Sequence, residues 1–496
     1  MDTLSDPRLL FAVLVPLVGA GGVMLAGRRP NLRDGCSLVA AVVLFGVVLS
    51  LVPDVRAGRV PACTLFDLLP GLSFTLRADP LSMVFAVVAS LLWILTVFYS
   101  AGYMRGLKEH AQTRFNTCFA LAIFGAIGCA FSDNLLTLYL FYEIVSVTTY
   151  PLVAHHQDDE GYEGGRKYLI YLTTTAKALL LPAMALLYVL NGNLDFAHNS
   201  QSGVLSPEIH RAIVTGLYIA FLLGFAKNGI MPLHHWLPGA MVAPTPVSAL
   251  LHAVAVVKVG VFSTVRVMLF VFGTDTMGAL NLGLPTAYFV SITIIGASVI
   301  ALTKDNLKTR LAYSTVSQLS YIILGVALLT PAGIEGGVVH IANHAFSKIT
   351  LFFCAGAIYV AAHKKNISEM SGLGRAMPWT FGAFAVASLS MIGAPPVAGF
   401  ISKWYLLLGA WDAGSIGLIV VLLASTILNA AYFAPVAYKA FFGQPTVPVG
   451  GHGQPGPAHG EAPLAMLLPL LLTALLSVLM GVFPGFFMHF ARAVLP

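Results

Sequence analysis

Charged side chains are scarce in this sequence: 10% of the 496 residues are Asp, Glu, Lys or Arg, whereas 57% are hydrophobic. This composition excludes an ordinary soluble domain of such length, because a water-exposed surface needs far more charge. The charges gather in short runs between apolar stretches of about twenty residues, the length that crosses a bilayer as a helix. Spanning helices are therefore expected, since they satisfy their backbone hydrogen bonds internally.

Motifs that bind cofactors or nucleotides are missing as well. The five cysteines show no C-x-x-C spacing and mostly fall in apolar stretches, so we interpret them as small core residues. We find no dinucleotide-binding fold, Walker loop or iron-sulfur cysteine set, and we expect no cofactor, no metal and no catalytic residue. The net charge of +6 does not indicate nucleic acid, because the basic residues form no aromatic-interleaved patch.

The apolar runs predict an all-α polytopic membrane protein with about fourteen spans. These spans begin near residues 9, 36, 81, 114, 133, 166, 210, 247, 286, 308, 336, 378, 413 and 463. The acidic start is unlike a signal peptide, so the first hydrophobic run is expected to be retained.

Basic residues are distributed unevenly between the two sides of these spans. The loops after odd-numbered spans hold most of them: Arg28, Arg29, Arg33, Arg105, Lys108, Arg114, Arg166, Lys167, Lys304, Lys308, Arg310, Lys364, Lys365, Arg375 and Lys439. The opposite side holds Arg8, Arg56, Arg59, Arg77, Arg211 and Arg492. The positive-inside rule therefore puts both termini outside the cytoplasm.

Two expected spans are interrupted by glycine and proline in the same manner. The prolines are Pro232, Pro244 and Pro246 in span seven, and Pro395 and Pro396 in span twelve. The interruptions lie five spans apart, and a repeat of odd number inverts in the membrane. We therefore expect two inverted five-helix repeats, each with a broken helix, a pattern typical of transporters. The expected divisions are 1–113 for spans one to three, 114–271 and 286–442 for the repeats, and 443–496 for a loop and span fourteen.

The loop between Phe442 and Leu464 is rich in glycine and proline and contains His452 and His459. A solvated linker explains this composition better than a metal site does.

Ionisable residues inside the expected spans carry the functional interpretation. A charge at mid-membrane costs at least about 2.5 kcal/mol, so each retained base implies a partner, water or a function. The bases are Lys177, Lys227, Lys258, Arg266, Lys348 and Lys403. Glu143 is the clearest mid-span carboxylate, and we expect it to pair with Lys227, just before the first break, and to set its protonation.

Two further spans combine histidine with lysine. Lys258 lies six residues after His252, so the two serve successive steps of one path, or one of them is structural. His340, His344 and Lys348 follow an i, i+4, i+8 pattern, a polar stripe suited to relaying protons. A zinc pair of the two histidines is the competing interpretation, but no H-E-x-x-H glutamate accompanies it.

Lys403 follows the second break as Lys227 precedes the first, and we expect it to be the release site. Lys177 either joins the uptake region or only orients span six, and Arg266 is expected to be a structural or interface residue. Mid-span carboxylates are scarce, so the ionisable residues of the spans suit proton transfer better than sodium binding. Backbone carbonyls at the breaks could still coordinate sodium, so sodium transport stays an alternative.

The segment LHHWLPGAMVAPTPVSALLH at residues 233–252 resembles the signature of antiporter-like membrane subunits. This family includes Mrp-type Na⁺/H⁺ antiporter subunits and the proton-pumping membrane subunits of respiratory complex I and of membrane-bound hydrogenases. The same family is indicated by Tyr142-Glu143, by HIANHAFSK at 340–348 and by GAPPVAGF at 393–400. The resemblance covers most of the chain.

The resemblance implies a fourteen-helix fold with a buried hydrophilic axis. By position, Glu143 would be the helix-five glutamate, Lys227 the lysine of broken helix seven, and Lys258 or His252 the bridging group. His340 and His344 would form the central relay, and Lys403 would be the lysine of broken helix twelve. His234 and Lys177 are accessory candidates, although Lys177 is not expected from the motif. Gly239 also departs from it, because the family commonly has an acidic or amide residue there.

The resemblance further implies a proton-translocating subunit of a cation/proton antiporter, working beside other membrane subunits in a bacterial or archaeal inner membrane. The chain ends soon after span fourteen, as in the D-type Mrp subunit. A proton-pumping subunit of a complex I-like or hydrogenase-like redox complex is the alternative, so whether the chain belongs to an enzyme stays open. A quinone-binding oxidoreductase subunit is a third hypothesis. An inactive scaffold would not need mid-membrane bases, because burying them costs free energy.

Overall fold

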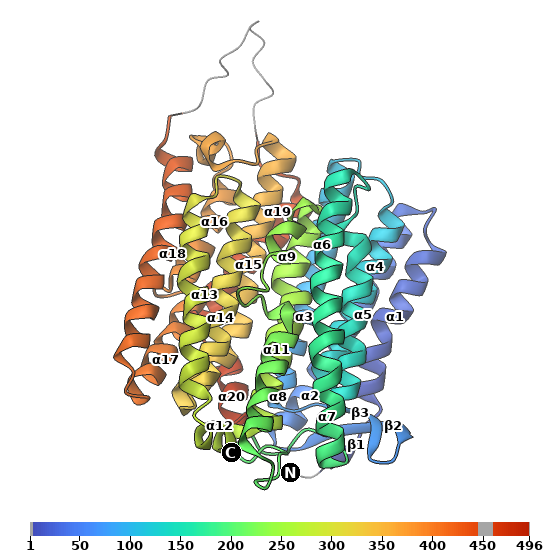
Figure 1. Cartoon of the computed structure of the whole chain (residues 1–496). Coiled ribbons are helices and arrows are strands. Elements are labelled where there is room, and N and C mark those ends of the chain that lie inside the picture. The colour runs from blue at the N-terminus through green and yellow to red at the C-terminus, as the bar shows by residue number, and fades with distance from the viewer. Residues whose placement is uncertain (1–2, 445–459, 496) are drawn as a thin grey trace, which may run out of the picture.

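Long helices run side by side through the computed structural model, which describes residues 3–444 and 460–495 (Figure 1). Both termini lie at one end of the bundle, which we call the terminal end (Figure 1). The other end, where the loop after α3 lies, is called the loop end. His452 and His459 lie outside the described residues.

Within the described residues, eleven helical stretches are long and apolar enough to cross a membrane. They are α1 (Arg8–Leu25), α2 (Pro30–Arg56), α3 (Pro80–Gly106), α4 (Gln112–Phe131), α5 (Leu135–Val153), the α6–α7 stretch (Asp159–Asn191), the α10–α12 stretch (Thr245–Ala279), α13 (Gly283–Thr303), α15 (Pro331–Ala362), α18 (Ile416–Phe442) and α19 (Leu464–Val482). Two shorter apolar helices are α8 (Arg211–Gly224) and α16 (Pro378–Ile392), and α14 (Leu307–Ala327) is more polar. Each of the expected spans thus has a helical counterpart, and the chain is a polytopic all-α membrane protein.

Two of the long stretches contain π-helical turns. The first is α6 (Asp159–Thr175), η1 (Ala176–Leu180) and α7 (Leu181–Asn191). The second is α10 (Thr245–Ala249), η4 (Leu250–Val254), α11 (Val256–Val267), η5 (Met268–Phe272) and α12 (Gly273–Ala279). Such turns occur frequently at functional sites, and these hold Lys177 and His252.

The structure confirms both helix interruptions. After α8 the chain forms η2 (Ala226–Asn228), an irregular segment, α9 (Trp236–Gly239) and η3 (Ala240–Val242). After α16 it leaves the helix and resumes at α17 (Ala398–Asp412). Gly229 and Gly393 end the helical segments with φ of +72° and +93°, a conformation that glycine adopts without a steric penalty.

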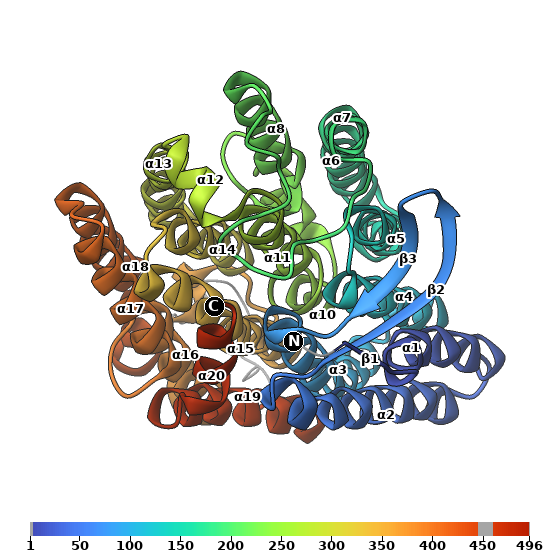
Figure 2. The ribbon, with the colours of Figure 1, turned by 90° about the horizontal axis from the view of Figure 1, so that it is seen from below.

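A small sheet at the terminal end was not expected. Strand β1 (Thr3–Ser5) pairs in parallel with β2 (Val60–Leu69), and β2 pairs antiparallel with β3 (Leu72–Arg77) (Figure 2). The turn dipeptide Pro70-Gly71 joins the last two strands, and it is the sequence signal for this hairpin. Three short helices were also missed: α20 (Gly485–Ala493), η6 (Ile367–Met370) and η7 (Leu373–Arg375).

Helix starts differ from expectation where the first turn is charged. Helix α2 begins at Pro30 rather than near 36, and α6 begins at Asp159 rather than near 166. In the view along the helices (Figure 2), α3, α10 and α15 lie in the middle of the bundle. Burial agrees with this placement, since 100% of the apolar window of the α10–α12 stretch and 83% of those of α3 and α15 are buried.

Candidate functional site

Lys227 lies in the first helix break and is fully buried. Its Nζ donates hydrogen bonds to the Tyr142 carbonyl oxygen at 2.9 Å and to Ser146 Oγ at 2.7 Å. The same nitrogen lies 3.1 Å from the centroid of the Tyr142 ring. Helix α5 therefore supplies every one of these contacts, and the break after α8 places the lysine on the short segment η2, from which it reaches α5.

Glu143 does not pair directly with Lys227, contrary to our expectation. No ion pair within 4 Å joins these two described residues; instead Ser146 Oγ lies 3.5 Å from Glu143 Oε1. Glu143 is half-buried, one helical turn before Ser146 on α5. The serine hydroxyl can accept from the lysine and donate toward the carboxylate, so it connects the two charged groups.

Helix α11 passes directly over the first break. A Cβ atom at Gly260 would lie 2.3 Å from the Lys227 carbonyl carbon, so only glycine allows this approach. Two residues earlier on α11, Lys258 is fully buried, and its Nζ lies 2.7 Å from Nδ1 of His344 on α15. This contact joins the segment of the first break to the helix that holds the histidine stripe.

His340 continues the stripe toward the second break. Its ring centroid is 5.9 Å from that of His344. Its Nδ1 lies 2.8 Å from Ser402 Oγ on α17, and its Nε2 lies 3.0 Å from Gln318 Oε1 on α14. Both ring nitrogens are therefore engaged, as a group that passes a proton from one nitrogen to the other requires.

Lys348 turns to a different chain of hydroxyl groups. Its Nζ donates to Ser314 Oγ at 2.8 Å, and Ser314 Oγ is 3.0 Å from the Tyr432 hydroxyl. The Tyr432 hydroxyl also contacts the side-chain carbonyl of Asn429, whose Nδ2 lies 3.4 Å from the Met391 carbonyl oxygen.

Lys403 binds the carboxyl-terminal end of α16. Its Nζ donates to the carbonyl oxygens of Met391 and Ile392, both at 2.9 Å. The last carbonyls of a helix are unpaired and carry a partial negative charge, so they stabilise an ammonium group. The shared Met391 carbonyl brings the ends of the Lys348 and Lys403 branches together.

Three predicted residues stand apart from this axis. His252 and His234 are buried, but neither ring has a hydrogen-bond partner among the described residues. The His252 ring instead packs 4.6 Å from the Phe352 ring. Lys177 is exposed on η1, so the structure does not bring it to the axis.

Uncharged residues that bridge the bases were missed by the sequence interpretation. They are Ser146, Ser314, Gln318, Ser402, Tyr432 and Asn429. A signal existed for one pair, because Ser314 and Gln318 stand at i, i+4 on one face of α14.

A polar cavity of about 320 Å³ opens at the loop end; we call it the loop-end cavity. It is lined in part by Glu109, His156, Pro244, Thr245 and Lys308. Thr245 begins α10, which runs on through η4 to His252 and α11. This cavity therefore touches the first residue of the α10–α12 stretch, whose later helix α11 carries Lys258.

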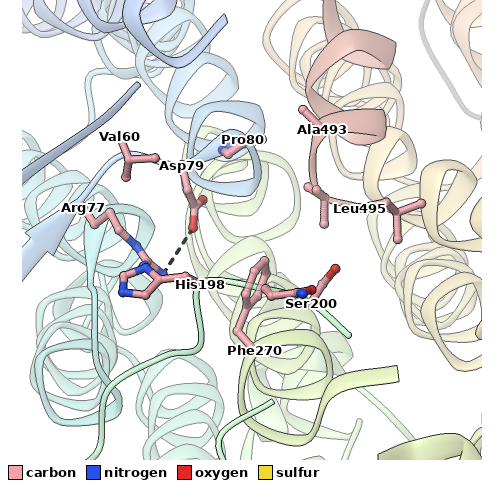
Figure 3. A pocket seen from close by; sticks show the side chains of 11 residues that line it. Val60, Arg77, Asp79, Pro80, His198, Ser200, Phe270, Ala493 and Leu495 are labelled. Atoms are coloured by element: carbon pink, nitrogen blue, oxygen red, sulfur yellow. Dashed lines mark hydrogen bonds and ion pairs between the residues drawn. The ribbon is translucent and has the colours of Figure 1, made fainter. Parts of the chain in front are cut away.

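A charge cluster closes the terminal end below α11. Arg266 Nη2 donates to Asp79 Oδ1 and Ser82 Oγ, both at 2.9 Å, in line with the structural role expected for Arg266. Arg77 pairs with Asp133 at 2.8 Å and lies 3.8 Å from Asp79. Arg77 and Asp79 line a cavity of about 370 Å³ with His198 (Figure 3).

Burial raises the pKa of the Asp133 carboxyl to about 6, although the Arg77 guanidinium acts in the opposite direction. The pKa of Asp79 stays below its usual range, because the attraction of Arg266 and Arg77 outweighs the effect of burial.

Comparison with known proteins decides the family. The model of the family described as NADH:quinone oxidoreductase/Mrp antiporter, TM matches residues 132–429. The chain belongs to this family of antiporter-like membrane subunits. A second model, NADH-Ubiquinone oxidoreductase (complex I), chain 5 N-terminus, matches residues 71–116.

Curated relatives of this antiporter-like subunit include two quinone oxidoreductase subunits. NADH-quinone oxidoreductase subunit N of Desulforudis audaxviator is 32% identical over 445 residues, which cover 87% of this chain and 86% of that protein. Subunit L of Mycobacterium tuberculosis is 32% identical over 478 residues, covering 92% of this chain and 72% of that protein.

The antiporter-like subunit also has the fold of a chain in a solved multisubunit membrane complex. A chain of the Mrp complex from Dietzia sp. superposes with a TM-score of 0.86 at 22% identity, covering 98% of this chain and 96% of that one.

Proposed function

We propose that this antiporter-like subunit carries protons along the buried axis from Lys227 to Lys403. The observation that carries the proposal is the burial of the bases in contact with one another, with hydroxyl and amide side chains, or with backbone carbonyl oxygens. These bases are Lys227, Lys258, His340, His344, Lys348 and Lys403. Burying ionisable groups in a membrane interior costs free energy, and proton transfer is a function that requires each of them.

The Lys258–His344 contact is the central step of the proposed path. At 2.7 Å the two nitrogens share one proton, because two positive charges so close together in a dry interior repel strongly. A proton that arrives on Lys258 therefore favours release from His344 toward His340. The stripe on α15 then leads the charge to Ser402 and Lys403 beside the second break.

Protons suit this axis better than sodium does. Sodium prefers hard oxygen ligands, and the axis offers ammonium and imidazole nitrogens, with Glu143 as the half-buried carboxylate at its beginning. We propose that any Na⁺ exchanged by the complex passes through another subunit. The subunit would lie in the cell membrane with both termini outside the cytoplasm, as its basic loops indicate.

Two assemblies fit the subunit: a cation/proton antiporter of Mrp type and a redox-driven complex related to complex I. The 32% identity to quinone oxidoreductase subunits N and L favours the second, and the 30% identity over 422 residues to the putative antiporter subunit mnhA2 of Staphylococcus aureus favours the first. Isolation of the native complex and identification of its partner subunits separates the two. Nickel-iron or flavin subunits would indicate a redox machine, and several small hydrophobic subunits an antiporter.

Proton flux in vesicles that contain the intact complex tests the proposed path. We expect Lys227→Met to abolish flux, because methionine fills the site but carries no proton. Lys227→Arg should also abolish flux, since a guanidinium does not release its proton in a protein. Lys167→Ala is the matched control, because Lys167 is an exposed lysine that pairs with Glu163. Normal flux in an assembled Lys227→Met complex would reject the role of Lys227.

A further inference from the structure

Three histidines and a glutamate meet on two loops at the loop end. Glu109 and His110 follow α3, and His155 and His156 follow α5. One ligand atom from each of Glu109, His110 and His155 lies within 4.8 Å of the others. His156 Nδ1 is 3.7 Å and His155 Nε2 is 3.9 Å from Glu109 Oε2.

His155 is a fully buried histidine whose two ring nitrogens have no hydrogen-bond partner among the described residues. Leaving a buried polar group unpaired costs about 1–3 kcal/mol, so a compensating ligand is expected. The His110 and His155 ring centroids lie 4.8 Å apart, and a neutral imidazole carries a nitrogen lone pair that a metal ion can take.

We propose that Glu109, His110, His155 and His156 bind one divalent transition-metal ion of the Zn²⁺ type. Three imidazoles and a carboxylate suit Zn²⁺, whereas Ca²⁺ and Mg²⁺ prefer oxygen ligands throughout. With bonds of about 2.0–2.2 Å, a tetrahedral Zn²⁺ holds its ligand atoms roughly 3.3–3.6 Å apart. The ligand atoms of Glu109, His110 and His155 lie within 4.8 Å of one another, and His156 Nδ1 lies 3.7 Å from Glu109 Oε2, so the four side chains must move closer together to reach that range.

A metal ion at this site would connect two loops at the wall of the loop-end cavity. Glu109 and His156 both line the loop-end cavity, and they come from different loops. A bound ion ties the loop after α3 to the loop after α5 at the wall of this cavity. Binding of the ion does not depend on the proposed proton path.

Zinc binding by the purified full-length chain tests the proposal. The chain carries a tag without histidine, is stripped with a chelator, and is then titrated with Zn²⁺ against a chromophoric competitor. We expect one Zn²⁺ per chain and a higher midpoint of thermal unfolding with the ion than without it. His110→Ala removes an exposed ligand and should weaken binding by at least about tenfold, as should Glu109→Gln.

Two controls separate this site from other histidines. His489→Ala removes an exposed histidine from α20 at the terminal end, and the double variant H452A/H459A removes those of the Gly/Pro-rich loop. Both should bind Zn²⁺ with wild-type affinity. The proposal is overturned if the wild-type chain shows no saturable binding, or if H110A and E109Q bind as tightly as the wild type.

Discussion

Ser146 is an uncharged residue that lies between the buried base Lys227 and the carboxylate of Glu143. Its hydroxyl accepts from Lys227 Nζ at 2.7 Å and lies 3.5 Å from Glu143 Oε1. A hydrogen bond to a charged group is worth roughly 1.5–3 kcal/mol, which corresponds to a tenfold or larger change in rate. We therefore expect Ser146→Ala to reduce proton flux at least about tenfold in vesicles that contain the intact complex.

A matched serine gives the control for this variant. Ser90 is also fully buried, but its hydroxyl donates to the Ala86 carbonyl of its own helix, α3. Ser90→Ala should leave the flux unchanged. Similar fluxes for S146A and S90A would show that the serine does not connect lysine and glutamate.

The raised pKa of the Asp133 carboxyl predicts that the folded chain is more stable at lower pH. The pKa of its carboxyl is about 6 in the folded chain against an ordinary value of 3.8, so protonation favours the folded state. The unfolded carboxyl ionises near pH 3.8 and the folded one only near pH 6, so stability falls as the pH rises through this interval and is recovered on acidification. On going from pH 7.5 to pH 5, we expect the wild type to gain about 1 kcal/mol relative to Asp133→Asn. Thermal unfolding in detergent measures the difference, and parallel pH profiles would contradict it.

Helix α11 depends on one glycine for its approach to the first break. A side chain at Gly260 would meet backbone atoms of Lys227 and Asn228 at 2.3 and 2.4 Å, and backbone atoms cannot rotate away. We expect Gly260→Ala to destabilise the chain by about 1–3 kcal/mol and to reduce flux by displacing Lys227. Gly278→Ala on α12 is the control, since nothing lies within 4 Å of its added Cβ. The unfolding midpoint in detergent and proton flux are the measurements, and a wild-type midpoint for G260A would be the contrary result.

The elements themselves were largely predictable, for an identifiable reason. Length and hydropathy define each span, and the glycine-proline signals at Gly229 and Gly393 define the breaks, because these are local properties of the chain. The β2–β3 hairpin was missed because its residues are too few and too apolar to stand out beside the spans. The π-turns have no comparable local signal, and the inverted repeats stay a prediction.

At the scale of the whole molecule, the candidate site could be predicted only in part. Sequence identified the bases, because a buried charge in an apolar run is conspicuous wherever it occurs. It could not show that Lys258 meets His344 across 86 positions, or that Ser146 stands between Lys227 and Glu143. Contacts between distant segments depend on how the helices pack, and a serine in a span has many ordinary uses.

The orientation of the whole bundle gives a prediction that can be tested without the partner subunits. Both termini lie at one end (Figure 1), and Lys364 and Lys365 line the cavity at the other. The positive-inside rule puts the basic loops in the cytoplasm. Alkaline phosphatase fused after Leu495 should therefore be active, and green fluorescent protein fused there should be dark. Fusions that end after Lys365 should show the reverse, because that loop lies at the opposite membrane face. Fluorescence from the carboxyl-terminal fusion would contradict the predicted orientation, because it would put the termini in the cytoplasm and the loop-end cavity at the outer face of the membrane.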